Sequence, residues 1–490
     1  MPDLERHFEP FRVNTVGHDQ TFVSPCGEQR IVYADWTASG RLYRPIEEAL
    51  LNQFGPFVGN THSESSVTGS SMTVAYHEAQ HVLKRHVKAT ADDLILTCGA
   101  GMTAVVNKLQ RILGLKAPEG LRRYIDIAAH ERPVVFVTHL EHHSNHTSWY
   151  ETIADVVVVP PDAQGVVSLV ALEEQLHEYR QRPVKIGAFS ACSNVTGIFT
   201  PVHEMARLMH RAGGIALIDY SASAPYVDID MHPAGDPEGA LDAVLFSPHK
   251  FLGGPGSSGV VIFSRALYHN TVPDEAGGGT VAWTNPWGQY AFLEDIEARE
   301  DGGTPAFLQT IKAALAVKLK DAMTVEAMWA REAAIVPYAM DRLQAIPGVH
   351  LLAPAVRHRL AMLSFWVEDV HYNLMVRLLN DRFGVQSRGG CSCAGTYGHY
   401  LLHVDPSRSK AITDRIDTGD LSEKPGWVRL SFHPSTTMAD IDHSLHAVAE
   451  CVRHVGEWSR DYVYSNVTNE YAHRDGDDAL RQRVHKWFAL

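Results

Sequence analysis

The sequence lacks long hydrophobic runs and has few cysteines. No stretch of its 490 residues approaches the roughly 20 consecutive apolar residues that a membrane-spanning helix needs, so we expect no membrane partner. Six cysteines are too sparse for a disulfide framework at this length, which excludes the small disulfide-stapled class of secreted protein. They are Cys26, Cys98, Cys192, Cys391, Cys393 and Cys451.

Positive charge is scarce as well. The 43 Lys and Arg residues are outnumbered by 57 Asp and Glu residues, which gives a net charge of −14, and no long basic block occurs. We therefore expect neither nucleic acid nor an anionic membrane surface as a partner. The first eight residues contain acidic side chains and no apolar core, so they do not resemble a secretory signal. A cytoplasmic location is the prediction.

Short apolar runs alternate with helical patterns between about residues 92 and 264. Runs that are apolar throughout predict strands buried on both faces, and hence a largely parallel sheet covered by helices. Amphipathic helices are predicted from Val202 to Gly214, through Met102 to Leu109 and from Thr73 to Val87. The predicted strands include Val134 to Val137, Val156 to Val159, Ile186 to Phe189, Ile215 to Ile218, Ala243 to Phe246 and Val260 to Phe263.

After about residue 305 the pattern changes. A long helix is predicted from Phe307 to Met323 and beyond, followed by an α+β region with a strand from Ala361 to Trp366, a helix from Tyr372 to Phe383 and a strand from Trp427 to Phe432. The polar stretch 403–425 predicts an exposed excursion. Four parts are predicted: an N-terminal segment 1–32, a large domain 33–305, an interdomain helix with a small α+β domain 306–455, and a C-terminal helical tail 456–490.

A lysine and an aspartate each follow one of the predicted strands. Lys250 comes shortly after the run ending at Phe246, and Asp219 ends the run that begins at Ile215. Pyridoxal phosphate chemistry needs this combination: the amine forms a Schiff base with the cofactor aldehyde, and the carboxylate keeps a proton on the pyridine nitrogen. The alternative is a surface lysine and a strand-end aspartate that serve turns.

Other strand ends carry further candidates. Ala100 and Gly101 lie where a strand passes into a helix, and free N–H groups at a helix start bind phosphate. Asn194 follows another strand, where its amide can donate to a ring oxygen or simply stabilise a turn. Four histidines lie within residues 139–146, but their spacing completes no clear ligand set, so we expect no metal and assign one imidazole to stacking on a cofactor ring.

Together these residues resemble the class V aminotransferase family of fold-type I pyridoxal phosphate enzymes, most closely its cysteine desulfurase and selenocysteine lyase branch. The resemblance runs from Tyr33 to about Val448. It implies an α/β fold: a large domain with a mostly parallel seven-stranded sheet between helices, and a smaller α+β C-terminal domain. It also implies pyridoxal 5'-phosphate as cofactor, with Lys250 as the Schiff-base lysine, Asp219 as the partner of the pyridine nitrogen and His142 as the stacking imidazole.

The same resemblance implies a homodimer with shared active sites. In it, Thr280 reaches the phosphate of the neighbouring subunit. The remaining implied assignments are Asn194 in the family's Ser-Asn-x-x-Gly motif, Ser247 and His249 at the phosphate, Ala100 and Gly101 at the phosphate-binding turn, and Asn60 and His62 near the substrate.

A late glycine-rich segment, 387–395, bears on the subclass. Arg388 matches the arginine that binds a substrate α-carboxylate, for which the guanidinium fork is suited. Cys393 falls where desulfurases carry the cysteine that attacks substrate sulfur and becomes a persulfide. Cys391 is a rival nucleophile or a resolving thiol. A Cys-x-Cys pair can also bind metal, but no second pair accompanies it.

Two departures from the family pattern concern the cofactor contacts. Ala222 stands where desulfurases typically have Gln, so the hydrogen bond of that Gln is absent or comes from Ser221 or Ser223. Gly101 stands where the family has a side-chain phosphate contact, for which Thr103 is a candidate replacement.

The resemblance implies a cysteine desulfurase-like activity, which moves sulfur from L-cysteine to a cysteine persulfide and releases alanine. A sulfur-acceptor protein is then a further partner, beside the small amino-acid substrate. A pyruvate-forming C–S β-lyase, an epimerase and an aminotransferase remain alternatives, because one scaffold hosts several outcomes. A catalytically quiet sulfur-relay scaffold is the alternative from a different class.

Overall fold

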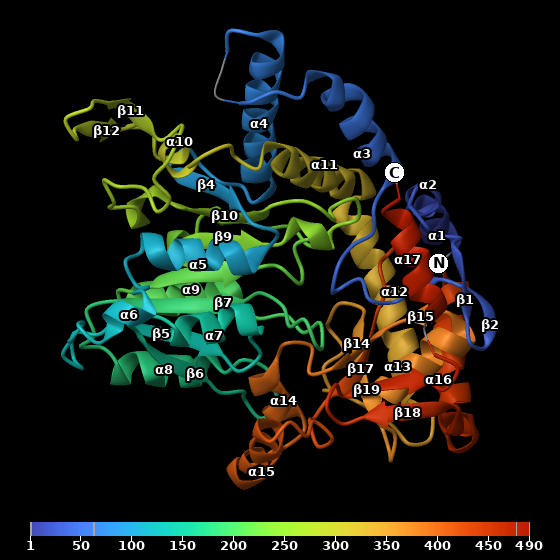
Figure 1. Ribbon diagram of the computed structural model, residues 1–490. Coiled ribbons are helices and arrows are strands. Elements are labelled where there is room, and N and C mark those ends of the chain that lie inside the picture. Colours follow the sequence, from blue (N-terminus) through green and yellow to red (C-terminus); the bar gives the residue numbers. More distant parts are fainter. Residues whose placement is uncertain (1, 62–63, 477, 490) are drawn as a thin grey trace. The chain divides into compact units, whose positions relative to one another are not determined.

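A computed structural model describes residues 2–61, 64–476 and 478–489 (Figure 1). The chain forms two compact units, and neither is a continuous stretch of sequence. Unit 1 comprises Met1–Arg12, Gly17–Trp36 and Arg331–Leu490, and unit 2 comprises Val13–Val16 and Thr37–Ala330. The four-part division predicted from the sequence stays a prediction.

A seven-stranded sheet forms the centre of unit 2. Its strand order is β4-β10-β9-β8-β7-β5-β6. Strand β10 is antiparallel to both of its neighbours, and the other pairs are parallel. The predicted α/β fold with a mostly parallel sheet is confirmed. The strands are β4 (Asp93–Cys98), β5 (Val134–Thr138), β6 (Asp155–Val159), β7 (Lys185–Ser190), β8 (Ile215–Asp219), β9 (Ala243–Phe246) and β10 (Gly259–Ser264).

Helices cover both faces of this sheet, which is why its strands are apolar throughout. Helix α5 (Met102–Ile112) packs Val105 and Leu109 against one face, in a core that includes Ala188 of β7. Helix α9 (Val202–Arg211) packs Met209 against Gly187, the residue just before Ala188 in the same strand. Because successive strand residues point to opposite faces, α5 and α9 lie on opposite sides of the sheet.

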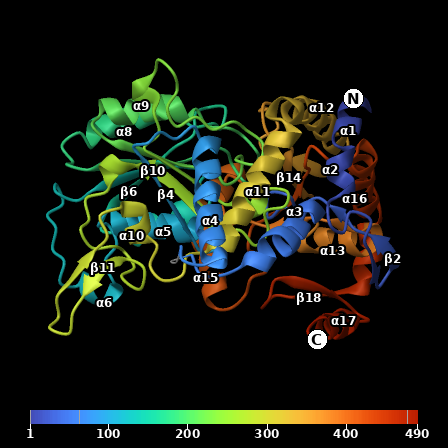
Figure 2. The ribbon, with the colours of Figure 1, turned by 90° about the horizontal axis from the view of Figure 1, so that it is seen from above.

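The rest of unit 2 surrounds this layered core (Figure 2). Helix α4 (Val67–His86) lies alongside α11 (Phe307–Met323), and both helices were predicted from the sequence. A hairpin of β11 (Val281–Thr284) and β12 (Tyr290–Phe292) stands away from the main sheet (Figures 1 and 2). Other elements of the unit are α3 (Arg44–Ala49), η1 (Leu50–Phe54), η2 (Gly55–Phe57), α6 (Glu119–Arg122), η3 (His143–Asn145), α7 (Thr147–Tyr150), α8 (Leu169–Glu178), η4 (Pro237–Gly239), η5 (Pro248–Lys250), η6 (Arg265–Leu267) and α10 (Ile296–Glu300).

Unit 1 is an α+β unit, as predicted. Its main sheet is antiparallel, in the order β13-β14-β17-β16, and its apolar core includes Leu363, Leu379 and Leu445. A separate parallel pair joins β3 near the start of the chain to β15. The strands are β3 (Val32–Tyr33), β13 (Val349–Leu351), β14 (Met362–Val367), β15 (Val385–Gln386), β16 (Arg388–Gly390) and β17 (Trp427–Ser431), with helices α13 (Tyr372–Phe383) and α16 (Met438–Trp458).

Two regions of unit 1 show more structure than the sequence indicated. The exposed excursion at 403–425 contains the helix α15 (Pro406–Asp417), and the tail contains the hairpin β18 (Tyr462–Ser465) and β19 (Glu470–His473) before its helix α17 (Asp478–Trp487). The remaining elements of unit 1 are α1 (Pro2–His7), β1 (Thr21–Ser24), β2 (Gly27–Arg30), α14 (Gly395–Leu401) and η7 (Ser459–Asp461). Two helices have residues in both units: α2 (Glu9–Val13) ends in unit 2, and α12 (Val325–Gln344) begins there.

Within the described ranges, no helix combines the length and the apolar character needed to cross a bilayer.

Candidate active site

The carboxyl ends of β4, β5, β7, β8 and β9 meet at one edge of the unit 2 sheet. All five strands run in the same direction, since β10 reverses the direction twice between β9 and β4. In open α/β sheets ligands bind outside this edge. Most of the site residues predicted in unit 2 lie at these strand ends or within four residues after them, so we take this edge as the candidate active site.

Asp219 is the last residue of β8, and its side chain is buried. The backbone N–H of Ser221 donates to its Oδ1 at 2.8 Å. Burial raises the pKa of the Asp219 carboxyl, while the hydrogen bond from Ser221 and the charge of Lys250 act in the opposite direction. Lys250, which follows the adjacent strand β9, therefore lies close enough to Asp219 to influence its ionisation.

Lys250 is held in place by crowded backbone. It ends the short helix η5 after β9, and its N–H donates to the carbonyl of Ser247 at 3.1 Å. A Cβ atom on Gly254 would lie 1.8 Å from the carbonyl oxygen of Pro248, and one on Gly40 would lie 2.0 Å from that of Phe251. Only glycine fits at these two positions, so the backbone fixes where the half-buried lysine leaves the chain.

A candidate anion seat lies at the start of α5. The N–H of Met102 donates to Ser247 Oγ at 2.8 Å, and Ser247 Oγ lies 3.3 Å from Ser221 Oγ. A Cβ atom on Gly101 would point at Ser247 Oγ, 3.1 Å away, and at the ring of His249, 3.6 Å away. The predicted phosphate residues Gly101, Ser247 and His249 are therefore together at a helix N-terminus, where backbone N–H groups favour phosphate. Ala100 lies in the same turn and is exposed.

The His249 ring is neutral at physiological pH. Burial, and after it the charge of Lys250, lowers its pKa from 6.5 to about 4. Its Nδ1 lies 3.3 Å from the hydroxyl of Ser39. A neutral imidazole beside the anion seat can donate one hydrogen bond without adding a second full charge next to Lys250.

His142 is oriented by the loop that follows β5. The N–H of Ser144 donates to His142 Nδ1 at 3.1 Å, so Nδ1 is the acceptor and Nε2 carries the hydrogen in the neutral ring. The hydroxyl of Ser144 in turn lies 2.6 Å from that of Thr103 in α5. Thr103, the candidate for a replacement phosphate contact, therefore belongs to the network that orients the half-buried His142.

Asn194, four residues after the end of β7, is buried. The segment after β8 contains the unusual Ala222, which is also buried. Of the two serines considered as replacements for the family's Gln, Ser221 bonds to Asp219 and lies beside Ser247, whereas Ser223 is fully buried. Ser221 is thus the better placed of the two.

Glu141 is a residue of this edge that the sequence analysis missed. Its carboxyl is fully buried between the ends of β5 and β7 and accepts hydrogen bonds from Thr138, Asn145 and Ser190, including one from Ser190 N–H at 2.8 Å. Burial raises its pKa from 4.5 to about 7 in spite of these bonds. The signal was an acidic residue three residues after a buried strand, next to the predicted stacking histidine.

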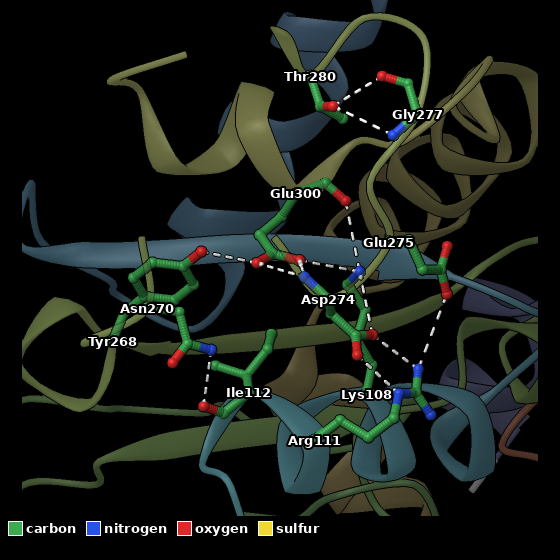
Figure 3. Close-up of polar contacts among 10 residues, drawn as sticks. All are labelled: Lys108, Arg111, Ile112, Tyr268, Asn270, Asp274, Glu275, Gly277, Thr280 and Glu300. Carbon is green, nitrogen blue, oxygen red and sulfur yellow. Dashed lines mark hydrogen bonds and ion pairs between the residues drawn. The ribbon is translucent and has the colours of Figure 1, made fainter. Parts of the chain in front are cut away.

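Thr280 lies in a loop that is clamped by buried charges (Figure 3). Its hydroxyl donates to the carbonyl of Gly277 at 2.7 Å and accepts from the Gly277 N–H at 3.2 Å. Below the loop, Lys108 of α5 forms ion pairs with Glu300 at 3.1 Å and with Asp274 at 3.6 Å. All three charged side chains are at least 94% buried, so the ion pairs are shielded from solvent. The role of Thr280 at a neighbouring subunit stays a prediction.

In unit 1, Arg388 belongs to a three-residue charge cluster. Its Nε donates to Asp35 Oδ2 at 3.1 Å, and the buried Arg429 donates to Asp35 Oδ1 at 2.8 Å. The Arg388 side chain is 48% exposed. Because Asp35 engages Nε, the two terminal nitrogens form the end of the fork that can bind a carboxylate.

The two late cysteines lie in one tight turn. The N–H of Ala394 donates to the carbonyl of Cys391 at 3.0 Å, and the central residues Ser392 and Cys393 have φ of 52° and 56°. Cys391 is half-buried and Cys393 is exposed. The nucleophile position predicted for Cys393 is therefore at the accessible tip of the turn.

Two residues predicted to lie near the substrate remain. Asn60 is exposed, and His62 lies outside the described residues. Among the residues that the structure describes, no group of three or more His, Cys, Asp or Glu side chains is arranged to hold a metal ion.

Known proteins align with most of the chain. A curated relative from Halalkalibacterium halodurans, named "Probable cysteine desulfurase", is 27% identical over 369 residues, which is 74% of this chain and 84% of the relative. "Probable cysteine desulfurase 2" of Mycobacterium leprae is 28% identical over 406 residues, 80% of this chain and 90% of the relative.

Solved structures share the fold. An apo cysteine desulfurase from Thermococcus onnurineus aligns with a TM-score of 0.71 at 18% identity, covering 91% of this chain and 98% of that one. The Escherichia coli cysteine desulfurase CsdA aligns with a TM-score of 0.69 at 21% identity and the same coverage. The family model for class V aminotransferases matches residues 32–443, which include the whole strand edge in unit 2 and the cysteine turn in unit 1. The chain therefore belongs to the class V aminotransferase family.

Proposed function

We propose that this protein is a pyridoxal phosphate-dependent cysteine desulfurase. The observation that carries the proposal is the position of Lys250, just after β9, near the buried Asp219 at the end of the adjacent strand β8 in a class V sheet. Two curated relatives, which match 74% and 80% of the chain, are named probable cysteine desulfurases, and the cysteine turn supplies an exposed thiol.

The residues present fit pyridoxal phosphate. The missing Cβ of Gly101 leaves the start of α5 open beside Ser247 and His249, which suits a phosphate. Asp219, buried beside a lysine, suits a protonated pyridine nitrogen. When bound, this cofactor supplies an electron sink for charge that develops at the substrate α-carbon. His142 would lie against its ring and Asn194 would bond its ring oxygen.

Three side chains of the protein then have separate roles in the reaction. Arg388, steadied by Asp35, binds the carboxylate of L-cysteine. The Lys250 amine takes the α-proton and returns a proton to the product. The Cys393 thiolate attacks the substrate sulfur, so that the substrate C–S bond breaks, a new S–S bond forms, and the bonding pair that remains on carbon is protonated. L-cysteine and the Cys393 thiol give alanine and a Cys393 persulfide.

A C–S β-lyase is the second candidate, and one observation favours it. Ala222 stands where desulfurases typically place a Gln side chain, and it is buried. A β-lyase would release pyruvate, ammonia and sulfide and would not need Cys393.

We propose further that the protein acts as a homodimer and delivers sulfur to an acceptor protein. The support for the dimer is the hairpin β11–β12, which begins directly after Thr280 and exposes Trp283, Trp287 and Tyr290 to 51%, 82% and 59%. Exposed aromatic clusters of this kind mark protein–protein contacts.

The activity is tested by assaying the products formed from L-cysteine. We expect alanine and not pyruvate from the wild-type holoenzyme, and a loss on the order of 10³-fold for Lys250→Ala, since general acid–base catalysis contributes about that much. Lys250→Ala should also lose the visible absorbance of the tethered cofactor. Lys88→Ala, at an exposed lysine of the same unit, is the matched control and should match the wild type.

The thiol role is tested by Cys393→Ser, which should form no alanine from cysteine. Full alanine formation by this variant would contradict the desulfurase assignment of Cys393. Pyruvate as the main wild-type product would favour the β-lyase instead.

A further inference from the structure

Cys391 and Cys393 occupy the first and third positions of one β-turn. The hydrogen bond from Ala394 to Cys391, with two successive left-handed residues between them, closes the turn. Ser392 and Cys393 adopt this conformation although neither is glycine, which is uncommon for a single residue and more so for two in a row. The turn therefore keeps both thiols at one end of β16.

The two thiols differ in how firmly they are anchored. Cys391 directly follows Gly390, which pairs with Trp427 in the unit 1 sheet. It is half-buried, and its charge is among the causes, after burial, that raise the pKa of Tyr372 to about 12. Cys393 lies two residues further, at the exposed tip. One thiol is thus accessible to a substrate, and the other is fixed and partly sheltered.

We propose that Cys391 is a second sulfur carrier that takes the sulfur atom over from Cys393. The proposal rests on the desulfurase function proposed above. The Cys391 thiolate attacks the outer sulfur of the Cys393 persulfide. The S–S bond at Cys393 breaks, its electron pair remains on Cys393 as a thiolate, and a new S–S bond joins the moved sulfur to Cys391. The proton lost by Cys391 is balanced by the one that Cys393 regains, so no oxidant or reductant is consumed.

Transfer of the outer sulfur is favoured over closure of a disulfide between the two cysteines. Attack on the inner sulfur would release sulfide and leave an oxidised turn that an external reductant must reopen. It would also join two residues only two positions apart within a closed turn, where disulfide geometry is hard to satisfy. Attack on the outer sulfur spans one atom more and restores the Cys393 thiol. The sulfur atom then remains on the half-buried Cys391, and the exposed Cys393 thiol can react with a second substrate.

This sulfur transfer from Cys393 to Cys391, the relay, predicts how many alanines and sulfur atoms each chain yields. In the absence of reductant, the wild-type holoenzyme with excess L-cysteine should form two alanines per chain in its burst and hold two sulfur atoms. Cys391→Ser should form one alanine and hold one sulfur, a twofold reduction, and Cys393→Ser should form none. Ser392→Ala, at the residue between the two thiols, is the matched control and should keep the burst of two.

The position of the sulfur is read separately. After one equivalent of ³⁴S-labelled cysteine, the thiols and persulfides are alkylated and the chain is cleaved after Arg388 and Arg408. Fragmentation between Cys391 and Cys393 then assigns the added mass. We expect label first on Cys393 and later on Cys391.

Each other result overturns the relay. A wild-type burst of one alanine with all label on Cys393, or a burst of two in Cys391→Ser, overturns it and leaves the desulfurase function intact. Alanine formation by Cys393→Ser with label on Cys391 makes Cys391 the primary nucleophile. Pyruvate without protein-bound sulfur overturns the relay and the desulfurase function together.

Discussion

Glu141 is a buried acid whose ionisation couples to folding. Its pKa rises from 4.5 to about 7 because burial outweighs five hydrogen bonds that favour the charged form. The folded protein therefore binds more protons at Glu141 than the unfolded chain does between these two values. Its stabilising contribution is complete below about pH 4.5 and is lost as the pH rises through about 7.

We expect Glu141→Gln to remove this pH dependence. The amide keeps the volume but offers a donor where Asn145 already donates, so the free energy of unfolding should fall by about 1–3 kcal/mol near pH 5 and by less near pH 8. Chemical denaturation at several pH values measures the difference from the wild type. Glu131→Gln, at an exposed glutamate just before β5, is the control, and a Glu141→Gln difference that does not vary with pH would contradict the pKa argument.

Candidate site residues could be predicted from the sequence where they stand close to a recognisable strand. Lys250, Asp219 and Gly101 stand at strand ends, and the apolar runs located those ends. Lys108 escaped notice, although it lies between Val105 and Leu109 on the apolar face of its own helix. A charged residue on such a face is a usable signal, but its partners Asp274 and Glu300 are distant in sequence, and only tertiary structure brings them together.

At the scale of elements, α5 links two parts of the candidate site. Its first turn forms the candidate anion seat, and further along Lys108 clamps the two ends of the segment that carries Thr280 (Figure 3). Tyr268 also donates to Glu300 at 2.7 Å, so the carboxylate is held from two sides. The clamp fixes the ends of this segment and leaves its hairpin exposed.

Removing the cation of this clamp should be costly. Lys108→Met leaves the fully buried Glu300 without its ion-pair partner, and we expect a loss of about 3–5 kcal/mol in the free energy of unfolding. The double variant Lys108→Met/Glu300→Gln should recover much of this loss, because no unpaired charge remains. Thermal and denaturant unfolding test both variants. Arg85→Ala, which breaks an exposed ion pair with Glu78, should change stability by less than about 1 kcal/mol.

The elements themselves were largely predictable because their periodicity is local. The helix Tyr372–Phe383 was located to the residue, and the strands of the large sheet were found as apolar runs. The antiparallel direction of β10 was not predicted, since an apolar run does not encode its direction. The helix α15 was missed because its composition is polar. Its start nevertheless carries a helix signal, since Asp405 accepts hydrogen bonds from the N–H groups of Ser407 and Arg408. A proline at the first helical position is a second signal.

At the scale of the whole molecule, the exposed hairpin tests the proposed dimer. We expect Trp283→Ser/Trp287→Ser to raise the dimer dissociation constant at least tenfold, since buried tryptophans commonly contribute more than about 1.4 kcal/mol each to an interface. Sedimentation across a range of concentrations measures the shift. Tyr124→Ser removes an aromatic that is 71% exposed elsewhere in unit 2, and it should leave the association unchanged. A wild-type protein that stays monomeric at high concentration would contradict the dimer.

The discontinuous make-up of unit 1 has a consequence for how the chain is made. Asp35, which steadies Arg388, precedes it by 353 residues, and the strand β3 finds its partner β15 at a similar separation. On the ribosome these early residues emerge long before the segment that completes their unit. We infer that the newly made N-terminal segment stays without these partners while the large sheet assembles, and that the bond between Asp35 and Arg388 forms only after residue 388 has emerged.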